Sequence, residues 1–289
     1  MRNWIVVFLT TGAAALLLLT VAVAARRSGQ TKSTVVATEG EIKNKEATAL
    51  PAGDQRPTPV LIELFTSEGC SSCPPADEVL ANFEQRQPFP GVEIIALGQH
   101  VDYWNRLGWT DPFSAAAFSE RQGEYADAFS RDGVYTPQMI VDGQAEFPGG
   151  NQAKARTAIT NAAKSPKAEI TVSRSPASSG SSAVTLQVSV EKLPAITAGD
   201  EAEVMLALTE SDLSTSVPRG ENAGRRLRHA SVVRQLVPIG SAQAGTSFAA
   251  RPTLTLNRDW RRKNLRAVIF IQERESRRVL GAASIKLAD

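Results

Sequence analysis

Histidine and cysteine are scarce in this 289-residue chain, and neither sign of charge is in large excess. Its 32 Lys and Arg residues nearly balance its 30 Asp and Glu residues, which leaves a formal net charge of +2. Proteins that bind nucleic acids usually carry a strong basic excess, so we expect no nucleic-acid partner. Only two histidines are present, His100 and His229, and most hydrolytic schemes that depend on a histidine base are therefore excluded.

Cysteine is equally rare, because Cys70 and Cys73 are the only two in the chain. A structural disulfide stabilises a protein mainly by restricting the unfolded chain, and this effect grows with the length of the loop that it closes. The loop between these cysteines is so short that little restriction results. Thiol–disulfide exchange, in contrast, needs an attacking thiolate and a resolving thiol close together. The spacing therefore favours chemistry over stabilisation.

The N-terminal segment predicts that the body of the protein lies outside the cytoplasm. Arg2 precedes an apolar stretch, Trp4–Ala24, which ends in the small-x-small pattern that signal peptidases accept. The stretch is also about long enough to cross a bilayer. We predict a signal peptide over residues 1–25, with an N-terminal membrane anchor as the alternative. Residues 26–57 are polar and predict a flexible linker. The expected location is the periplasm or the exterior of the cell, with anchoring to the inner membrane under the alternative.

Residues 58–165 predict alternating strands and helices in the order β-α-β-α-β-β-α. Val60–Phe65 is almost continuously apolar, which is typical of a buried central strand. Pro74 and Pro75 suit the first turn of a helix, because the N–H that proline lacks would be unpaired there. The two cysteines therefore lie where a strand turns into a helix.

Two short motifs predict turns and caps further along this segment. Asp111–Pro112 is typical of a helix N-cap followed by the first helical position. Asp142–Gly143 follows an apolar run and predicts a hairpin turn.

Beyond residue 165 the pattern becomes one of short alternating strands, which predicts a small antiparallel sandwich. The strand candidates are Val184–Val190, Val204–Leu208, Ser231–Val237, Thr253–Leu256, Leu265–Ile271 and Val279–Leu287.

A dithiol at the start of a helix can be activated by its position. The free N–H groups and the dipole at a helix N-terminus stabilise a thiolate and lower the thiol pKa. We therefore expect Cys70 to be the nucleophile and Cys73 to be the more buried, resolving thiol. Glu68 opposes this effect, since a nearby carboxylate raises a thiol pKa, to an extent that depends on where its side chain points.

Thr136–Pro137 stands just before a predicted strand, and here the chain resembles the thioredoxin superfamily, locally its glutaredoxin branch. Tyr135–Gly143 and Gly149–Gly150 carry this resemblance. It implies that Pro137 follows a cis peptide bond and shapes the substrate groove, and that the Thr136 backbone pairs with a bound cysteine-containing substrate.

Three segments are also similar to the signature of a secreted thioredoxin-like family, the domain of unknown function 1223. They are Glu63–Asp77, His100–Trp104 and Gly220–Gly224. The resemblance implies a fold class of an α/β thioredoxin-like domain with a helical insert over residues 58–165, followed by an all-β, sandwich-like domain over residues 166–289. It brings no established substrate. Ser71–Ser72 differs from the residues between the cysteines of thioredoxins and glutaredoxins, which leaves the direction of electron flow undecided.

We therefore expect a thiol–disulfide oxidoreductase that needs no cofactor. Its expected partners are a protein substrate with a thiol or disulfide and a redox donor. One alternative is a copper-binding or metal-delivery protein that uses Cys70, Cys73 and His100 as ligands. The other is a binding module in which the disulfide is structural.

Several other residues are expected to have structural roles. His229 lies in a basic stretch and is expected at the surface or at a sheet edge. Trp104 and Trp109 are expected to pack an inserted loop, with one of them as a candidate cover for the dithiol. Gly220–Gly224 is expected to be a simple turn.

Overall fold

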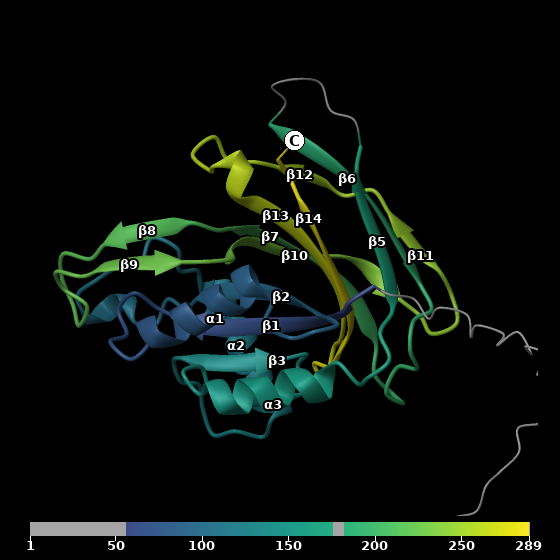
Figure 1. The fold of residues 1–289 in the computed structure, drawn as a ribbon, viewed down its shortest axis with the longest axis horizontal. Helices are drawn as coiled ribbons and strands as arrows, with labels where there is room; N and C mark the ends of the chain where they lie inside the picture. The colour runs from purple at the N-terminus through teal and green to yellow at the C-terminus, as the bar shows by residue number, and fades with distance from the viewer. Residues whose placement is uncertain (1–55, 176–181, 289) are drawn as a thin grey trace, which may run out of the picture. The chain divides into compact units, whose positions relative to one another are not determined.

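The computed structural model describes residues 56–175 and 182–288, which are arranged around one large twisted sheet (Figure 1). The predicted signal peptide or membrane anchor (residues 1–25), and all of the predicted linker except its last two residues, lie outside the described residues. Within the described ranges, no helix combines the length and the apolar character needed to cross a bilayer.

The first half of the described chain follows the predicted order of strands and helices. Its elements are β1 (Thr58–Thr66), α1 (Pro74–Arg86), β2 (Val92–His100), the 3₁₀ helix η1 (Asn105–Leu107), α2 (Ala116–Ala128), β3 (Gln138–Val141), β4 (Ala145–Pro148) and α3 (Gln152–Ala162).

The second half is built from strands, and all six candidates from the sequence are found. Its elements are β5 (Glu169–Arg174), β6 (Ala183–Glu191), β7 (Ala202–Glu210), β8 (Leu213–Ser216), β9 (Arg226–His229), β10 (Val232–Ala242), β11 (Phe248–Ala250), β12 (Thr253–Thr255), the 3₁₀ helix η2 (Arg262–Asn264), β13 (Leu265–Glu273) and β14 (Val279–Lys286).

The predicted fold class is wrong. If an α/β thioredoxin-like domain were followed by a separate all-β domain, each segment would form a sheet of its own. Instead, strands from both segments form one mixed eight-stranded sheet in the order β14-β13-β7-β10-β2-β1-β3-β4. The described residues contain three α-helices against fourteen strands, so the fold is mostly β.

The two segments join where β10 lies parallel to β2, with Val232 opposite Gly98. Gly98 donates its N–H to the Ser231 carbonyl over 2.7 Å. A Cβ atom at position 98 would lie 3.1 Å from the Ala230 carbonyl oxygen, which is tighter than ordinary contact. The glycine therefore permits this close approach. Strand alternation shows which face of a strand is buried but does not show its neighbour, so the sequence did not reveal this junction.

Both faces of the β1–β2 region are covered. One face packs on α1 and α3 through a cluster that includes Ile62, Leu80 and Ile159. The opposite face packs through a cluster that includes Phe118 of α2 and Phe270 of β13. This double coverage explains why β1 is an almost continuous apolar run in the sequence.

Four further strands form a second sheet in which β6 pairs with β5, β11 and β12, and β8 and β9 form a separate two-stranded hairpin. A cluster that includes Leu186 of β6, Leu206 of β7 and Ile269 of β13 fills the space between this sheet and the large one. Two sheets thus pack face to face, but the predicted separate sandwich domain is wrong, because one of the two is the extended central sheet.

Candidate functional site

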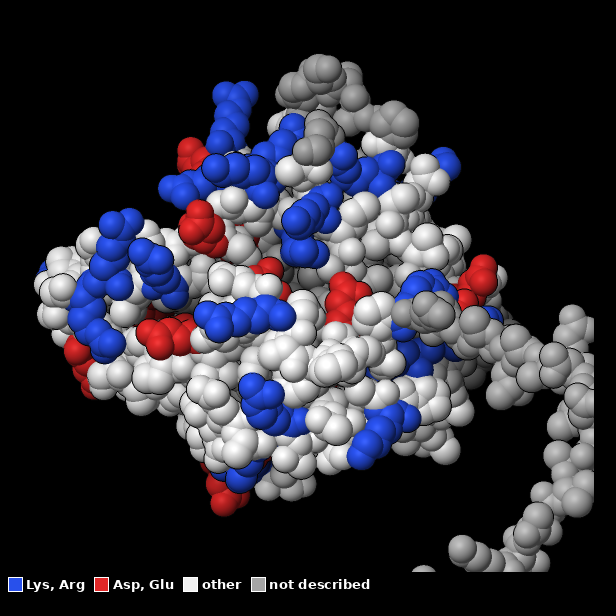
Figure 2. All heavy atoms as spheres, in the orientation of Figure 1, with Lys and Arg blue, Asp and Glu red and all other residues white. Residues whose placement is uncertain are grey.

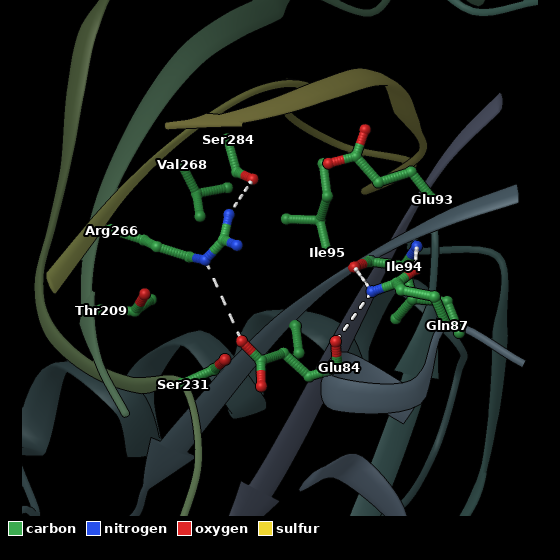
Figure 3. A pocket seen from close by; sticks show the side chains of 11 residues that line it. Glu84, Gln87, Glu93, Ile94, Ile95, Thr209, Ser231, Arg266, Val268 and Ser284 are labelled. Carbon is green, nitrogen blue, oxygen red and sulfur yellow. Dashed lines mark hydrogen bonds and ion pairs between the residues drawn. The ribbon is translucent and has the colours of Figure 1, made fainter. Parts of the chain in front are cut away.

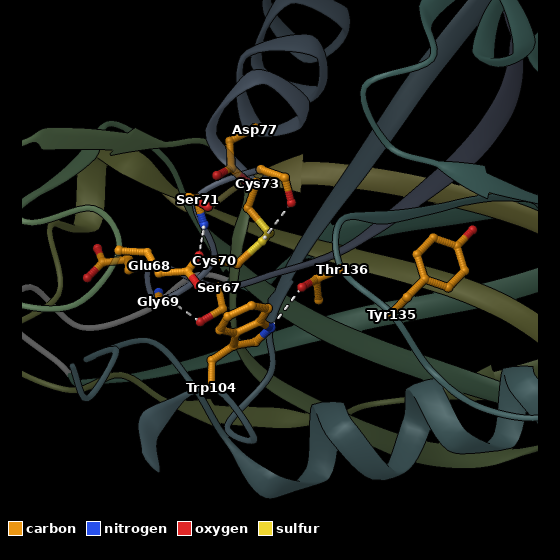
Figure 4. The surroundings of a disulfide bond; sticks show 12 residues. Ser67, Glu68, Gly69, Cys70, Ser71, Cys73, Asp77, Trp104, Tyr135 and Thr136 are labelled. Carbon is orange, nitrogen blue, oxygen red and sulfur yellow. Dashed lines mark hydrogen bonds between the residues drawn. A yellow bond between two sulfur atoms is a disulfide. The ribbon is translucent and has the colours of Figure 1, made fainter. Parts of the chain in front are cut away.

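Cys70 and Cys73 form a disulfide at the start of α1, with their Cα atoms 5.4 Å apart (Figure 4). Cys73 is the N-cap of the helix, and Pro74 and Pro75 follow in its first turn. The Cys73 N–H donates to the Cys70 carbonyl over 3.2 Å, which closes the loop. The predicted position of the cysteines between a strand and a helix is confirmed.

The cysteines are buried to the same degree. Both have 0% of their surface exposed, whereas Ser71 and Ser72 between them are exposed. The Cys70 sulfur lies 3.3 Å from the Ser72 hydroxyl. The prediction that Cys73 would be the more buried of the two is therefore wrong for the disulfide form, in which both sulfurs lie beneath the surface.

The segment Gly220–Gly224 holds the cysteine loop in place. The Asn222 side chain is buried and donates to the carbonyls of Glu68 and Cys70, each over 2.9 Å. The Glu221 carboxylate accepts the Ser71 N–H over 3.0 Å, and the hydrogen bonds from Ser71 lower the pKa of Glu221. The segment is a turn, as predicted, but it also contacts residues about 150 positions earlier in the chain.

Changing Asn222 to alanine is expected to lower the free energy of unfolding by about 2–4 kcal/mol. The Glu68 and Cys70 carbonyls would each lose the amide donor, with the Cys70 carbonyl keeping the Cys73 N–H, and an unsatisfied buried polar group costs about 1–3 kcal/mol. The loop would also loosen, so dithiothreitol should reduce the disulfide faster. Urea unfolding and the rate of reduction measure the two effects.

A matched control is Asn82→Ala, since Asn82 also donates to a backbone carbonyl, that of Glu78, but is exposed on α1. We expect this change to cost less than about 0.5 kcal/mol. Equal losses in the two variants would contradict the anchoring role of Asn222.

Behind the loop lies a buried group of ionisable side chains, which we call the histidine–carboxylate cluster. Its members are Glu68, Asp77, His100, Asp111 and His229, all less than 9% exposed. The His229 and His100 rings meet edge to face with their centroids 4.7 Å apart.

Each histidine of the cluster has a carboxylate partner. His229 Nε2 lies 3.0 Å from Glu68 Oε1, and His100 Nδ1 lies 2.7 Å from Asp111 Oδ2. The other Glu68 oxygen accepts the Trp109 Nε1–H over 2.8 Å. The Glu68 carboxylate is thus engaged with His229 and Trp109.

One expectation from the sequence is met only in part, and another is wrong. His229 lies at a sheet edge, because β9 belongs to a two-stranded sheet with β8, but it is not at the surface, since only 4% of it is exposed. Asp111 does not cap a helix beginning at residue 112, because α2 begins at Ala116. Asp111 instead accepts the Glu68 N–H over 2.8 Å and holds His100. Burial by itself would raise the pKa of Asp111, but the facing His100 and these hydrogen bonds hold it below its usual range.

Asp77 completes the cluster from the first turn of α1. Burial raises its pKa to about 7, and the carboxylates of Asp111 and Glu68 also raise it. His229 and the polar Thr66 hydroxyl act in the opposite direction. Sequence reasoning missed Asp77, although a signal existed: it stands four positions after Cys73, one turn along the predicted helix.

Thr136 and Pro137 lie beside the start of α1. The Thr136–Pro137 peptide bond is cis, as the resemblance implies. The Thr136 hydroxyl accepts the Trp104 Nε1–H over 2.8 Å, and Trp104 lies next to the cysteine loop (Figure 4). A Cβ atom at Gly149 would lie 2.9 Å from Ala76 Cβ and 3.3 Å from Pro137 Cβ. The segment before β3 therefore packs closely against the helix that begins with the cysteines.

The copper site of the alternative hypothesis is not assembled. In the part of the chain that the structure describes, no three His, Cys, Asp or Glu side chains are placed to hold a metal ion. His100 Nδ1 faces Asp111, and the cysteine sulfurs bond to each other. Cys70, Cys73 and His100 do not form a ligand set.

A small cavity lies at the far end of α1, away from the cysteines (Figure 3). It has a volume of about 40 Å³, and Glu84 of α1 faces Arg266 of β13 across it at 4.0 Å. This is room for about one water molecule, so a substrate would not fit.

Exposed basic side chains lie on and beside β9. Arg225, Arg226 and Arg228 are exposed around β9, and Figure 2 shows basic side chains gathered over the end of the molecule that carries the β8–β9 hairpin.

Comparisons with known proteins give a family and a fold. The family described as "Protein of unknown function (DUF1223)" matches residues 61–272. A crystal structure of protein AGR_C_4864 from Agrobacterium tumefaciens is similar, with 25% identity, a TM-score of 0.59, and coverage of 82% of this chain and 97% of that chain. HBP35 of Porphyromonas gingivalis has 14% identity, a TM-score of 0.57, and coverage of 80% of this chain and 76% of that chain, a likeness that concerns the fold alone. No curated protein matches the sequence.

Proposed function

The chain belongs to the DUF1223 family, whose description names no activity, and from the geometry of its site we propose that it is a thiol–disulfide oxidoreductase that works outside the cytoplasm. One observation carries the proposal. The two cysteines of the chain are joined at the N-terminus of α1, directly in front of a buried cluster of acid and base groups.

The chemistry follows the usual course of thiol–disulfide exchange. The Cys70 thiolate attacks a substrate disulfide, forms a mixed disulfide and releases one substrate thiolate. Cys73 then attacks the Cys70 sulfur, which breaks the bond to the second substrate sulfur and restores the Cys70–Cys73 disulfide. The N-terminal N–H groups and the dipole of α1 stabilise the attacking thiolate.

The substrate would be a protein that carries a thiol or a disulfide, and a separate redox donor would return electrons to the site. We place the substrate groove between the cysteine loop and Thr136–Pro137, since these segments pack side by side. Because both cysteines are buried in the disulfide form, a substrate must displace part of their cover, for which Trp104 is the candidate. The apolar N-terminal stretch supports export, with membrane anchoring as the alternative.

Changing Cys70 to serine is expected to abolish exchange, whereas changing Cys73 to serine should leave a protein that attacks but cannot resolve. Insulin reduction with dithiothreitol should therefore fall to the uncatalysed rate in both variants. When the reduced variants are mixed with insulin in the absence of dithiothreitol, only Cys73→Ser should accumulate a mixed disulfide, which mass spectrometry detects as a covalent adduct. If the wild-type protein is as inactive as both variants with reduced and oxidised substrates, the proposal is wrong.

A binding module with a structural disulfide is the second candidate, and the complete burial of both cysteines favours it. The reduction potential separates the two functions. Structural disulfides in secreted proteins typically have potentials below about −300 mV, and redox-active ones lie higher. Equilibration with glutathione buffers would measure this value.

A further inference from the structure

We propose that the exposed face of the β8–β9 hairpin is the docking surface for the protein partner of the disulfide, and that it selects partners with acidic residues beside the reacting cysteine. The inference rests on the proposed thiol–disulfide function and names the chemistry of its partner. We call this surface the arginine face, and its members, all exposed, are Arg219, Arg225, Arg226 and Arg228.

The arginine face accounts for the net charge of the whole chain. Residues 211–230 contain these four arginines and two acidic residues, Asp212 and Glu221, whereas basic and acidic residues are equal in number over the rest of the sequence. The formal charge of +2 is therefore concentrated on the hairpin, and Figure 2 shows basic side chains gathered at that end of the molecule. A local excess of one sign on an otherwise neutral chain favours a partner of the opposite sign.

Strand alternation leaves the arginines of β9 without acidic neighbours. Arg226 and Arg228 lie on the exposed face of β9, and the residues that alternate with them are buried. Across the hairpin, Arg226 lies opposite Ser216 and Arg228 lies opposite Ser214. Opposite charges often pair at such cross-strand positions. Here the facing residues are serines, and among the residues that the structure describes no carboxylate forms an ion pair with a member of the arginine face.

Hydrogen bonds to neutral groups hold two members of the face in place. Arg226 Nη2 donates to the Ser214 hydroxyl over 3.0 Å, and Arg225 Nη1 donates to Asn222 Oδ1 over 2.8 Å. A guanidinium has several N–H donors in a fixed fork, so each of the two arginines keeps donors for a carboxylate. Because these side chains are already ordered, binding a partner costs less conformational entropy.

Asn222 connects the arginine face to the cysteine loop. Its Nδ2 donates to the Cys70 carbonyl over 2.9 Å, and its Oδ1 accepts from Arg225. The Glu221 carboxylate is directed at the Ser71 N–H of the same loop. A partner whose sulfur reaches Cys70 therefore brings the residues beside that sulfur close to Arg225. Carboxylates at these positions would form charge-assisted, paired hydrogen bonds with the guanidinium groups.

The position of the face favours an acidic protein over nucleic acid. Exchange at Cys70 requires a partner with a thiol or a disulfide, which nucleic acids lack. The rest of the chain also carries no net charge that would attract a long polyanion.

The test compares two short peptides that each carry one cysteine, activated as its mixed disulfide with thionitrobenzoate. Glutamates flank the cysteine in the acidic probe, and glutamines flank it in the neutral probe. In the reduced full chain, the Cys70 thiolate attacks the peptide sulfur, and thionitrobenzoate leaves with the electron pair of the broken S–S bond. Stopped-flow absorbance of the released thionitrobenzoate gives the second-order rate constant, and the charge of the leaving group is the same in both probes.

For the wild-type protein we expect the acidic probe to react at least about tenfold faster than the neutral probe at low ionic strength. Salt screens interactions between exposed charges, so this ratio should approach one in about 1 M sodium chloride, where the Debye length is about 3 Å.

Variants of β9 test which charges produce the ratio. Combining Arg226→Gln with Arg228→Gln removes two charges from residues that do not contact the cysteine loop, and the ratio should fall by at least about threefold. Arg226→Glu with Arg228→Glu should make the acidic probe the slower one. Arg251→Gln with Arg258→Gln is the matched control, because it removes two exposed arginines that flank β12 in the second sheet, and it should keep the wild-type ratio.

The outcomes separate the two proposals. A wild-type protein that releases thionitrobenzoate from neither probe would overturn the thiol–disulfide function, on which the docking surface rests. Release from both probes at equal rates, or a ratio that survives the changes at Arg226 and Arg228, would overturn the docking surface alone. Tighter binding of a DNA duplex than of the acidic peptide, measured by fluorescence anisotropy at physiological salt, would overturn it in favour of a nucleic-acid surface.

Discussion

Changing Arg121 to methionine is expected to lower the free energy of unfolding by about 3–5 kcal/mol, because it leaves the Glu63 carboxylate buried without a counter-charge. Glu63 of β1 is 1% exposed and Arg121 of α2 is 5% exposed. The guanidinium donates to both carboxylate oxygens, over 2.8 Å from Nε and 2.9 Å from Nη2.

The same carboxylate has further donors, which explains why the effect should be large. The Tyr125 hydroxyl and the Gln99 amide also donate to Glu63. Arg121 in turn reaches Gln272 of β13 over 2.8 Å, so the group links β1, α2 and the C-terminal half. Methionine fills a similar volume but satisfies none of these oxygens.

The pH dependence gives a second readout for this variant. Burial alone would raise the pKa of Glu63, but Arg121 and the hydrogen-bond donors hold it below its usual range. In the wild-type protein the carboxylate therefore stabilises the fold at neutral pH, and this contribution is lost as the pH falls below the usual range of a glutamate. Without Arg121, burial should raise the pKa of Glu63. The loss of unfolding free energy relative to the wild-type protein should therefore shrink in acid, as Glu63 takes up a proton.

Urea unfolding followed by circular dichroism measures both effects. Arg131→Met is the matched control, since Arg131 also pairs with a carboxylate, that of Glu146, but its side chain is 42% exposed. We expect the control to cost less than about 1 kcal/mol. Similar losses in the two variants, or a deficit that does not change with pH, would contradict the role given to the buried pair.

Changing Gly143 to alanine is expected to cost about 3 kcal/mol or more. Gly143 has a φ of +67°, which is unfavourable for a residue with a side chain. In addition, a Cβ atom there would lie 1.8 Å from the Arg277 carbonyl oxygen, a backbone atom that cannot rotate away. Both the turn and the segment before β14 would have to shift.

Two other glycines separate the contributions to this loss. Gly199 has a φ of +86° but no atom within 4 Å of its Cβ position, so Gly199→Ala should show the backbone cost alone, about 1 kcal/mol. Gly123 lies in α2 with open space around it, and Gly123→Ala should stabilise the protein by about 0.5–1 kcal/mol. Thermal unfolding of the three variants gives the ranking, and a Gly143→Ala loss no larger than that of Gly199→Ala would contradict the clash.

Features that depend on residues close together along the chain were predictable from the sequence. The strand–cysteine–helix arrangement, the Asp142–Gly143 turn and the order of the elements up to α3 all follow from patterns that span a few residues. Apolar periodicity, the fixed φ of proline and the permissive backbone of glycine act locally, so they can be read without knowledge of the fold.

Only the tertiary structure decided what lies beside these local features. The junction of β10 with β2 merges the two expected domains into one sheet, and it brings Asn222 and His229 to the cysteine loop across more than 150 residues. Strand alternation identifies a buried face but no pairing partner. A histidine in a basic stretch gives no sign of a carboxylate partner 161 positions away, because that contact exists only once the strands are paired.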